Sequence, residues 1–164
     1  MMQGETQWPS SKRSFAGSSS RIPLSSLRSS AKGLRIRAPN YPTQKLLESL
    51  GAAPVGMPPT QVYENLEKGV IDGAVFPWDA IKGFRLENIL KHHLDARVYT
   101  SCFHLVMSPK RYAELPPEVK QAIDATTGQA LTDKFGAWWN KWDQAGLDAV
   151  TPLNHEIVRV DDAT

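Results

Sequence analysis

Apolar residues change their spacing several times between Gly33 and Asp79, and each change predicts a new element. Leu34 and Ile36 alternate with two arginines, which is the period-two pattern of a half-buried strand. Further along, apolar residues recur at helical spacing or form short runs. The pattern predicts a strand over 34–37, a helix over 42–50, a strand over 54–57, a helix over 60–69 and a strand over 70–76.

Residues that favour turns and helix ends support these boundaries. Pro42 suits the first turn of a helix, Thr60 is a candidate N-cap, and Gly69 is a candidate helix stop. Strands and helices that alternate with short connections are typical of a parallel α/β sheet. Ligands of such sheets bind just beyond the carboxyl ends of the strands. The pattern places Arg37 and Phe76 at those ends.

The second half of the chain is predicted to be mainly helical. Residues 78–91 carry the apolar positions of one or two short helices, and 96–99 and 102–107 favour extended segments. Over 117–150 the apolar residues keep helical spacing, which corresponds to roughly 50 Å at 1.5 Å per residue. A small lobe needs no helix of that length. We therefore expect this helix either to cross between two lobes or to kink near 127–128.

The first 30 residues have a different composition from the rest. They contain ten serines, four lysines or arginines and a single acid, Glu5. A segment so poor in apolar residues cannot bury much surface, so we expect residues 1–26 to form a disordered, serine-rich leader. An organellar transit peptide has a similar composition. A displaced start or a remnant of an incomplete gene is favoured over it, because no clear amphipathic stripe accompanies the serines.

Composition excludes several classes of protein. A net charge of +2 with 22% charged residues gives no signal for nucleic-acid binding. The single cysteine, Cys102, excludes an internal disulfide and any metal site with several cysteines. No run of residues approaches the roughly 18 apolar residues of a membrane span. These observations favour a soluble globular protein.

Three stretches of the chain carry a family resemblance. In order, they read GLRIRAPN, LGAAPVGMPPTQVYENLEKGVIDGAVFPW and FHLVMSPKRYAELPPEVKQAI. Together they resemble the substrate-binding proteins of tripartite ATP-independent periplasmic (TRAP) transporters, the DctP-type family. Each motif alone is weak, but their order and spacing are specific. The resemblance covers about Leu27 to Val150, which is most of the chain.

The resemblance implies a fold and a function. Members of this family have two α/β lobes, joined by crossing strands and a long helix, that close on their ligand like a hinge. The implied protein is a periplasmic solute receptor, not an enzyme, that captures an organic acid by its carboxylate and delivers it to TRAP membrane permease subunits. It implies no cofactor, no metal and no nucleic-acid partner. Some relatives dimerise through the long helix, so a homo-oligomer is a further alternative.

The resemblance also divides the chain. Roughly the first half of a family member has no counterpart in this sequence, so the first lobe is expected to be largely missing. What remains is a periplasmic-binding-protein-like α/β lobe with a mostly parallel sheet, plus a long inter-lobe helix. The expected parts are the disordered leader 1–26, a ligand-binding lobe 27–98, a return strand with its helix and the long crossing helix 99–150, and an incomplete tail 151–164.

Arg37 is the first candidate for ligand binding. An arginine where a strand leaves the sheet can pair bidentately with a carboxylate, or it can be a solvated surface residue. The resemblance implies the first role, because the family holds its substrate carboxylate with the matching arginine. Arg35, on the same strand face, is interpreted as structural. Asn40 follows in the next loop, where its amide either contacts the ligand or caps the helix at Pro42.

Phe76 and Trp78 complete the predicted ligand set. Both stand at the end of the third strand, at the mouth of the expected pocket, although either could instead be a core aromatic. Some family members have asparagine at the position of Phe76. Others have glutamate and tryptophan at 75 and 76, where this chain has Val75 and Phe76. An aromatic lining favours an apolar or aromatic organic acid over a polyhydroxylated one.

The histidines support only a weaker hypothesis. His92 and His93 are adjacent, so they point to opposite faces and are predicted to be surface residues. His104 lies in an apolar run and is predicted to be a core histidine. An enzyme that uses His104 or the His92–His93 pair, with Asp79 or Asp95 as partner, is the less favoured alternative to the receptor. A non-functional or oligomer-dependent fragment of such a receptor is another.

Overall fold

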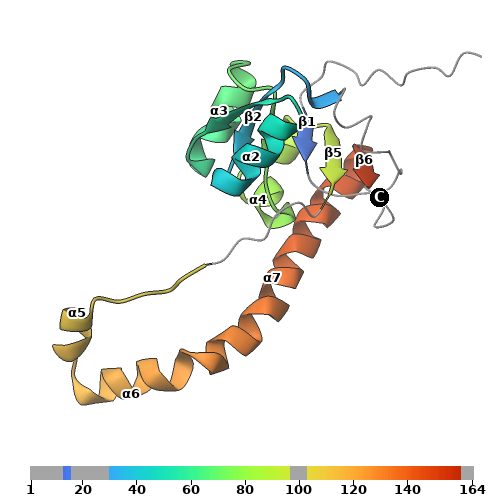
Figure 1. Cartoon of the computed structure of the whole chain (residues 1–164). Helices are drawn as coiled ribbons and strands as arrows, with labels where there is room; N and C mark the ends of the chain where they lie inside the picture. The colour runs from blue at the N-terminus through green and yellow to red at the C-terminus, as the bar shows by residue number, and fades with distance from the viewer. Residues whose placement is uncertain (1–12, 16–29, 97–102, 160–164) are drawn as a thin grey trace, which may run out of the picture. The chain divides into compact units, whose positions relative to one another are not determined.

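The computed structural model describes residues 13–15, 30–96 and 103–159 of the 164-residue chain. The chain divides into two compact units. Unit 1 contains residues 1–99 and 143–164, and unit 2 contains residues 100–142. Figure 1 shows the elements of both units.

Unit 1 is built on a six-stranded sheet in which every neighbouring pair of strands is parallel. The strand order is β3-β2-β4-β1-β5-β6. The strands are β1 (Arg13–Phe15), β2 (Arg35–Ala38), β3 (Ala53–Gly56), β4 (Gly73–Val75), β5 (His92–Asp95) and β6 (Glu156–Arg159). The parallel α/β architecture predicted from the sequence is therefore confirmed.

Helices connect these strands in the predicted alternation. In chain order they are α2 (Tyr41–Ser49), η1 (Pro59–Gln61), α3 (Val62–Glu67), α4 (Trp78–Gly83), η2 (Leu86–Asn88) and η3 (Thr151–Leu153). The predicted cap at Thr60 is wrong, because Thr60 lies within η1 and α3 begins after Gln61 without a side-chain cap. Gly69 does follow the end of α3, with a positive φ of 67° that favours glycine.

Helices cover both faces of the sheet with apolar side chains. On one face, Leu47 of α2 packs with Ile36 and Val75. On the other, residues from α3, α4 and the end of α7 share a core with Ala74 and Phe76. Successive strand residues point to opposite faces, so Arg37 points to the second face with its neighbours Ala74 and Phe76. Residues 36–38 of β2 are therefore buried on both faces of the sheet, and the prediction of a half-buried strand is wrong for them.

The prediction of a disordered leader is corrected at three residues. Arg13–Phe15 form β1, which pairs in parallel with β4 on one side and β5 on the other. Three residues carry too little local signal to predict a strand, and backbone pairing with partners some sixty to eighty residues away decides the conformation here. The remaining leader residues, 1–12 and 16–26, lie outside the described residues.

Unit 2 is helical. It contains α5 (Pro109–Ala113), α6 (Pro117–Thr126) and the first part of α7 (Gln129–Val150). The predicted interruption near 127–128 is confirmed, because Gly128 separates α6 from α7 with a φ of 65°. The described part of the expected strand 102–107 forms no strand. Among the described residues, no helix is long and apolar enough to cross a membrane.

Candidate functional site

The candidate site lies where two adjacent parallel strands end. β2 and β4 pair directly, with Arg37 opposite Ala74. Arg37 is the penultimate residue of β2, and Phe76 follows the last residue of β4. The prediction that both residues lie at the carboxyl ends of their strands is confirmed. The structure adds that the two side chains meet, because the Arg37 guanidinium carbon lies 4.2 Å from the centroid of the Phe76 ring.

Arg37 is buried, with only 5% of its surface exposed. Its Nε donates to the backbone carbonyl of Met57 at 3.3 Å, and its Nη1 donates to the carbonyl of Val75 at 2.9 Å. These bonds use two of the five N–H donors of a guanidinium. The interpretation as a solvated surface arginine is therefore excluded.

Two backbone carbonyls and an aromatic ring offset the energetic cost of burying the Arg37 charge. A cation taken out of water is costly unless its donors are hydrogen-bonded. The two carbonyl groups come from the segments after β3 and within β4, and the aromatic face of Phe76 attracts the cation as well. The result is a fixed positive charge at the carboxyl end of the sheet, where an anion would be stabilised.

Asn40 caps the helix that follows β2. Its Oδ1 accepts from the backbone N–H of Thr43 at 3.0 Å and from the Thr43 hydroxyl at 2.8 Å. This is the capping role that the sequence left open beside ligand binding. The cap fixes the side chain two residues beyond β2, close in sequence to Arg37, and directs its oxygen into α2.

Phe76 and Trp78 both pack within unit 1. Phe76 is 5% exposed, and its ring centroid lies 5.9 Å from that of Phe84. Trp78 begins α4, is half-buried against the same core and lies 5.4 Å from the ring of His93. The core roles that the sequence left open are therefore present for both residues.

Arg35 and Asp72 form a surface ion pair. Arg35 donates from Nε and Nη2 to the two carboxylate oxygens of Asp72 at 2.9 and 2.7 Å, and its backbone N–H donates to the same carboxylate at 2.9 Å. Both side chains are substantially exposed, so the pair contributes little energy. It fixes the start of β2 beside the segment that leads into β4, in agreement with a structural role for Arg35.

The prediction of surface histidines is wrong for His93. Its side chain is fully buried, and its Nε2 lies 3.0 Å from Nδ1 of His155. His92 points the other way, and its Nδ1 lies 2.9 Å from a carboxylate oxygen of Glu156. The partners come from β6 and the turn before it, more than 60 residues away. No local sequence signal could have indicated this pairing.

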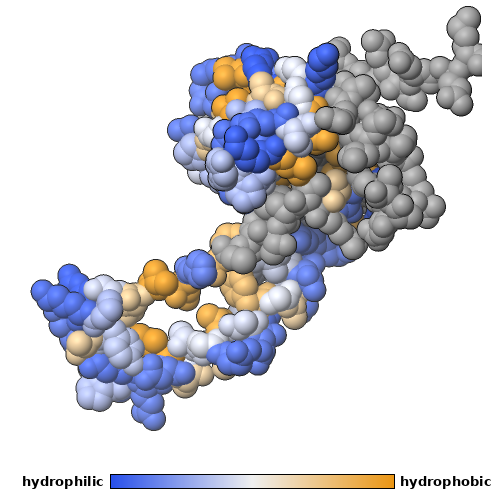
Figure 2. Space-filling model, viewed as in Figure 1, coloured by the Kyte–Doolittle hydropathy of each residue, from blue (hydrophilic) through white to orange (hydrophobic). Residues whose placement is uncertain are grey.

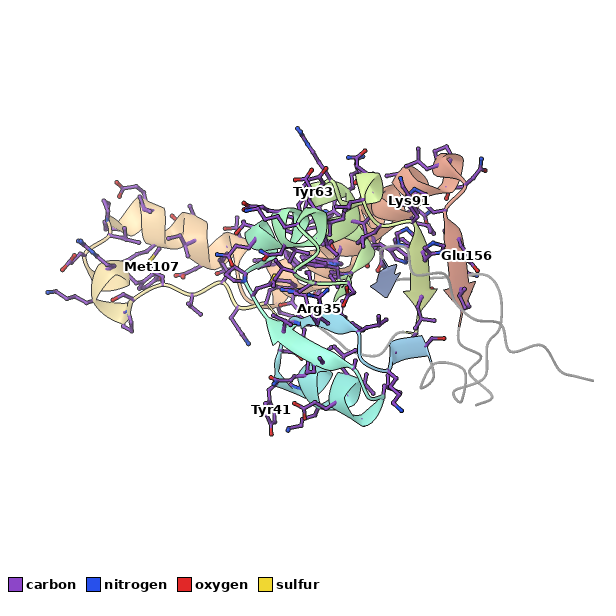
Figure 3. All side chains as sticks on the ribbon, turned by 90° about the horizontal axis from the view of Figure 1, so that it is seen from above. Arg35, Tyr41, Tyr63, Lys91, Met107 and Glu156 are labelled. Atoms are coloured by element: carbon purple, nitrogen blue, oxygen red, sulfur yellow. The ribbon has the colours of Figure 1, made fainter. Side chains whose placement is uncertain are left out.

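Burial changes the acid–base behaviour of this cluster. Desolvation, reinforced by the neighbouring charges of His155, His92 and Lys91, lowers the pKa of His93 to about 3. Desolvation also lowers the pKa of His155, with Lys91 and His92 adding to the effect. Figure 3 shows Lys91 and Glu156 close together at this edge of the sheet, where the Glu156 N–H donates to the carbonyl of Lys91.

The two aspartates of the enzyme hypothesis contact other residues. The backbone N–H of Asp79 donates to Asp143, whose charge together with burial raises the pKa of Asp79, burial being the larger cause. Asp95 lies 3.9 Å from Arg159. His104 is exposed rather than in the core, so that prediction is wrong. The described residues hold no group of three or more histidine, cysteine or acidic side chains that could bind a metal.

Known proteins with this fold include several solute-binding proteins of TRAP transporters. A marine metagenome protein specific for aromatic acid ligands, crystallised with metahydroxyphenylacetate, is 29% identical with a TM-score of 0.78. The chain covers 46% of it, and 93% of the chain is matched. A protein from Rhodoferax ferrireducens T118, crystallised with copurified benzoate, is 29% identical with a TM-score of 0.76, over 89% of this chain and 46% of that one.

Sequence comparison leads to the same class of protein. The protein YiiZ of Salmonella typhimurium, itself uncharacterised, is 29% identical over 137 residues, which are 79% of this chain and 40% of YiiZ. A solute-binding protein of Albidiferax ferrireducens is 27% identical over 82% of this chain and 40% of its own length. This chain thus spans less than half the length of these relatives.

The family follows from the match over most of the chain. Residues 5–155 match the DctP model, described as bacterial extracellular solute-binding protein, family 7, and the chain belongs to this family. The resemblance found in the sequence is confirmed. The match begins before β1, so it includes residues of the expected leader.

Proposed function

We propose that this chain carries the carboxylate-binding site of a TRAP-type solute receptor, with Arg37 holding the carboxylate of an organic acid. The observation that carries this proposal is a buried guanidinium, fixed by two backbone carbonyls, at the carboxyl ends of β2 and β4. Ligands of parallel α/β sheets bind at such ends. The planar fork of an arginine matches a carboxylate better than a lysine does.

An aromatic monocarboxylate is the proposed ligand class. The structural neighbours at 29–30% identity were crystallised with metahydroxyphenylacetate, benzoate and 3-hydroxybenzoate. In this chain the residues that follow β4 are Phe76, Pro77 and Trp78, none of which carries a charge. An apolar wall beside a single cation suits a ring that bears one carboxylate.

The other predicted ligand residues are proposed to contact the ligand or to line the site beside Arg37. Asn40 has its oxygen committed to Thr43, so its amide NH2 is the group proposed to donate to a second ligand oxygen. Trp78 is half-buried and is proposed to expose part of its ring to the ligand. Phe76 is proposed to line the site where its ring supports Arg37.

The receptor role extends to location and partners. We propose a periplasmic protein that delivers its ligand to TRAP membrane permease subunits and catalyses no reaction. The family to which the chain belongs and its solute-binding relatives support this proposal. A second candidate, a fragment that functions only within an oligomer, is favoured by the exposed apolar segment 103–107 in unit 2.

Removing Arg37 tests the proposal. We expect Arg37→Ala to weaken the binding of benzoate about 30-fold or more, since losing one partner of a desolvated charge pair costs on the order of 2–5 kcal/mol. Arg37→Lys should recover only part of the loss, because an ammonium cannot pair bidentately. Ligand-observed NMR measures the affinity of each variant, because it detects weak as well as tight binding.

The matched control is Arg35→Ala, which removes an arginine from the same strand but from an exposed ion pair. Its affinity for benzoate should equal that of the wild type. Benzyl alcohol, which has the ring without the charge, should bind far more weakly than benzoate. Equal benzoate affinity in the Arg37→Ala and Arg35→Ala variants, with both folded by circular dichroism, would contradict the assignment.

A further inference from the structure

Phe76 and Arg37 form a unit that the carboxylate assignment alone does not explain. The guanidinium carbon lies 4.2 Å from the ring centroid, within the range of a cation–π contact. Two carbonyls constrain the guanidinium through Nε and Nη1, which lie in its plane. The Phe76 ring contacts the guanidinium in addition to these hydrogen bonds. Together the two carbonyls and the ring restrict both the position and the rotation of the guanidinium.

Phe76 is itself held in place. It is 5% exposed, belongs to the apolar core shared by α3 and α4, and contacts Phe84 at a centroid separation of 5.9 Å. Its backbone follows Val75, whose carbonyl accepts from Arg37. Two neighbouring residues therefore provide both a carbonyl and an aromatic ring that orient the guanidinium.

We propose that Phe76 is a positioning residue that acts on the ligand through Arg37, and this inference rests on the proposed function. The electron-rich ring face stabilises the cation where water is excluded and keeps the guanidinium oriented before the ligand arrives. Orientation in advance improves affinity because less side-chain freedom is lost on binding. A polar residue at position 76 could contact a ligand directly, whereas Phe76 uses its ring for the arginine.

A fluorinated series at position 76 separates ring electrostatics from packing. Replacing Phe76 by 4-fluoro-, 3,5-difluoro- and 3,4,5-trifluorophenylalanine withdraws charge from the ring face while nearly preserving its shape. We expect the affinity for benzoate to fall stepwise, several-fold across the series, with no matching trend in the unfolding temperature. Phe76→Tyr should retain most of the affinity, and Phe76→Leu should lose it.

The same series at Phe84 is the matched control. Phe84 packs against Phe76 in the same core but stacks on no guanidinium in the described part of the chain. Fluorination at Phe84 should leave benzoate affinity unchanged. An equal loss of affinity at both positions would show that core packing is responsible and would overturn the proposal.

A measurement without ligand tests the Arg37–Phe76 contact separately from the receptor assignment. Nitrogen-15 NMR of the Arg37 side chain reports rotation about its Nε–Cζ bond. We expect this rotation to become faster with each fluorine at Phe76 and to stay unchanged with fluorine at Phe84. Unchanged rotation in the Phe76 series would overturn the positioning role even where benzoate binds. Faster rotation without any carboxylate binding would uphold the orientation of Arg37 by Phe76 and contradict the proposed function.

Discussion

Gly146 shows how a single missing side chain determines a contact between helices. It lies in α7 against the peptide group that joins Trp78 and Asp79 at the start of α4. A Cβ at this position would overlap the carbonyl of Trp78. The carboxylate of Asp143, one turn earlier in α7, accepts from the backbone N–H of Asp79. α7 therefore contacts backbone groups at the start of α4.

Gly146→Ala is expected to destabilise the protein although alanine favours helix. The helix preference alone would stabilise by up to about 1 kcal/mol. Here the overlap is with backbone, which cannot move aside, and overpacking typically costs about 1–3 kcal/mol. Gly136→Ala is the control, since Gly136 lies in the same helix with no atom near the added Cβ. Urea denaturation should show opposite signs for the two variants, and equal effects would contradict this contact.

At the residue scale, local signals predicted roles only where local structure decides them. The position of Arg37 at a strand end and the capping position of Asn40 were both readable from the sequence. Asp143 and Gly146 could not be linked to Asp79 and Trp78, because the sixty-odd residues between them give no sign of the contact.

At the scale of elements, a chain of polar contacts joins β5 to the segment before β6. Lys91 Nζ lies 3.4 Å from His155 Nε2, and His155 Nδ1 lies 3.0 Å from His93 Nε2. An ammonium group can only donate, so Nε2 of His155 accepts. A neutral His155 then carries its proton on Nδ1 and donates to His93. The proton of His93 is thereby assigned to Nδ1, which is buried without a partner among the described residues.

This arrangement predicts that acid weakens the protein. The folded pKa of His93, about 3, lies below the ordinary value of 6.5. The unfolded chain therefore takes up a proton first as the pH falls below 6.5, and stability declines until His93 itself titrates. The decline approaches about 1.4 kcal/mol per pH unit for one site. His155, whose pKa is also lowered, contributes in the same direction.

His93→Gln tests this acid sensitivity, because glutamine can accept from His155 but does not titrate. We expect its unfolding free energy to fall less steeply than that of the wild type between about pH 7 and 5. The raised pKa of Asp79 acts in the opposite sense and is common to both proteins. His104→Gln, at an exposed position, should keep the wild-type slope. Identical slopes for wild type and His93→Gln would contradict the assigned pair.

The sequence predicted well those elements in which apolar residues recur at the regular spacing of a helix or a strand. The alternation from β2 to β4 was correct because each element carries its own apolar spacing and its own turn residues. β1 and β5 were missed for a shared reason. Arg13–Phe15 and His92–Asp95 contain few apolar residues, and both are strands because neighbours distant in sequence pair with their backbone.

At the scale of the whole molecule, the two units differ in how well they bury apolar surface. Unit 1 encloses a core on each face of its sheet. In unit 2, Leu105 and Val106 are 86% and 85% exposed, while Phe103 stacks on Trp139 at 4.6 Å. Figure 2 shows apolar residues at the surface of this unit. Exposed apolar segments of this kind promote association.

The central claim is that Arg37 of unit 1 holds a carboxylate, and the position of a bound acid tests it most directly. Crystals grown with 4-bromobenzoate would locate the ring by the anomalous scattering of bromine. We predict the carboxylate at about 2.7–2.9 Å from a nitrogen of the Arg37 guanidinium, with the ring beside the segment that follows β4. An acid bound elsewhere, with Arg37 contacting only protein groups, would contradict the claim.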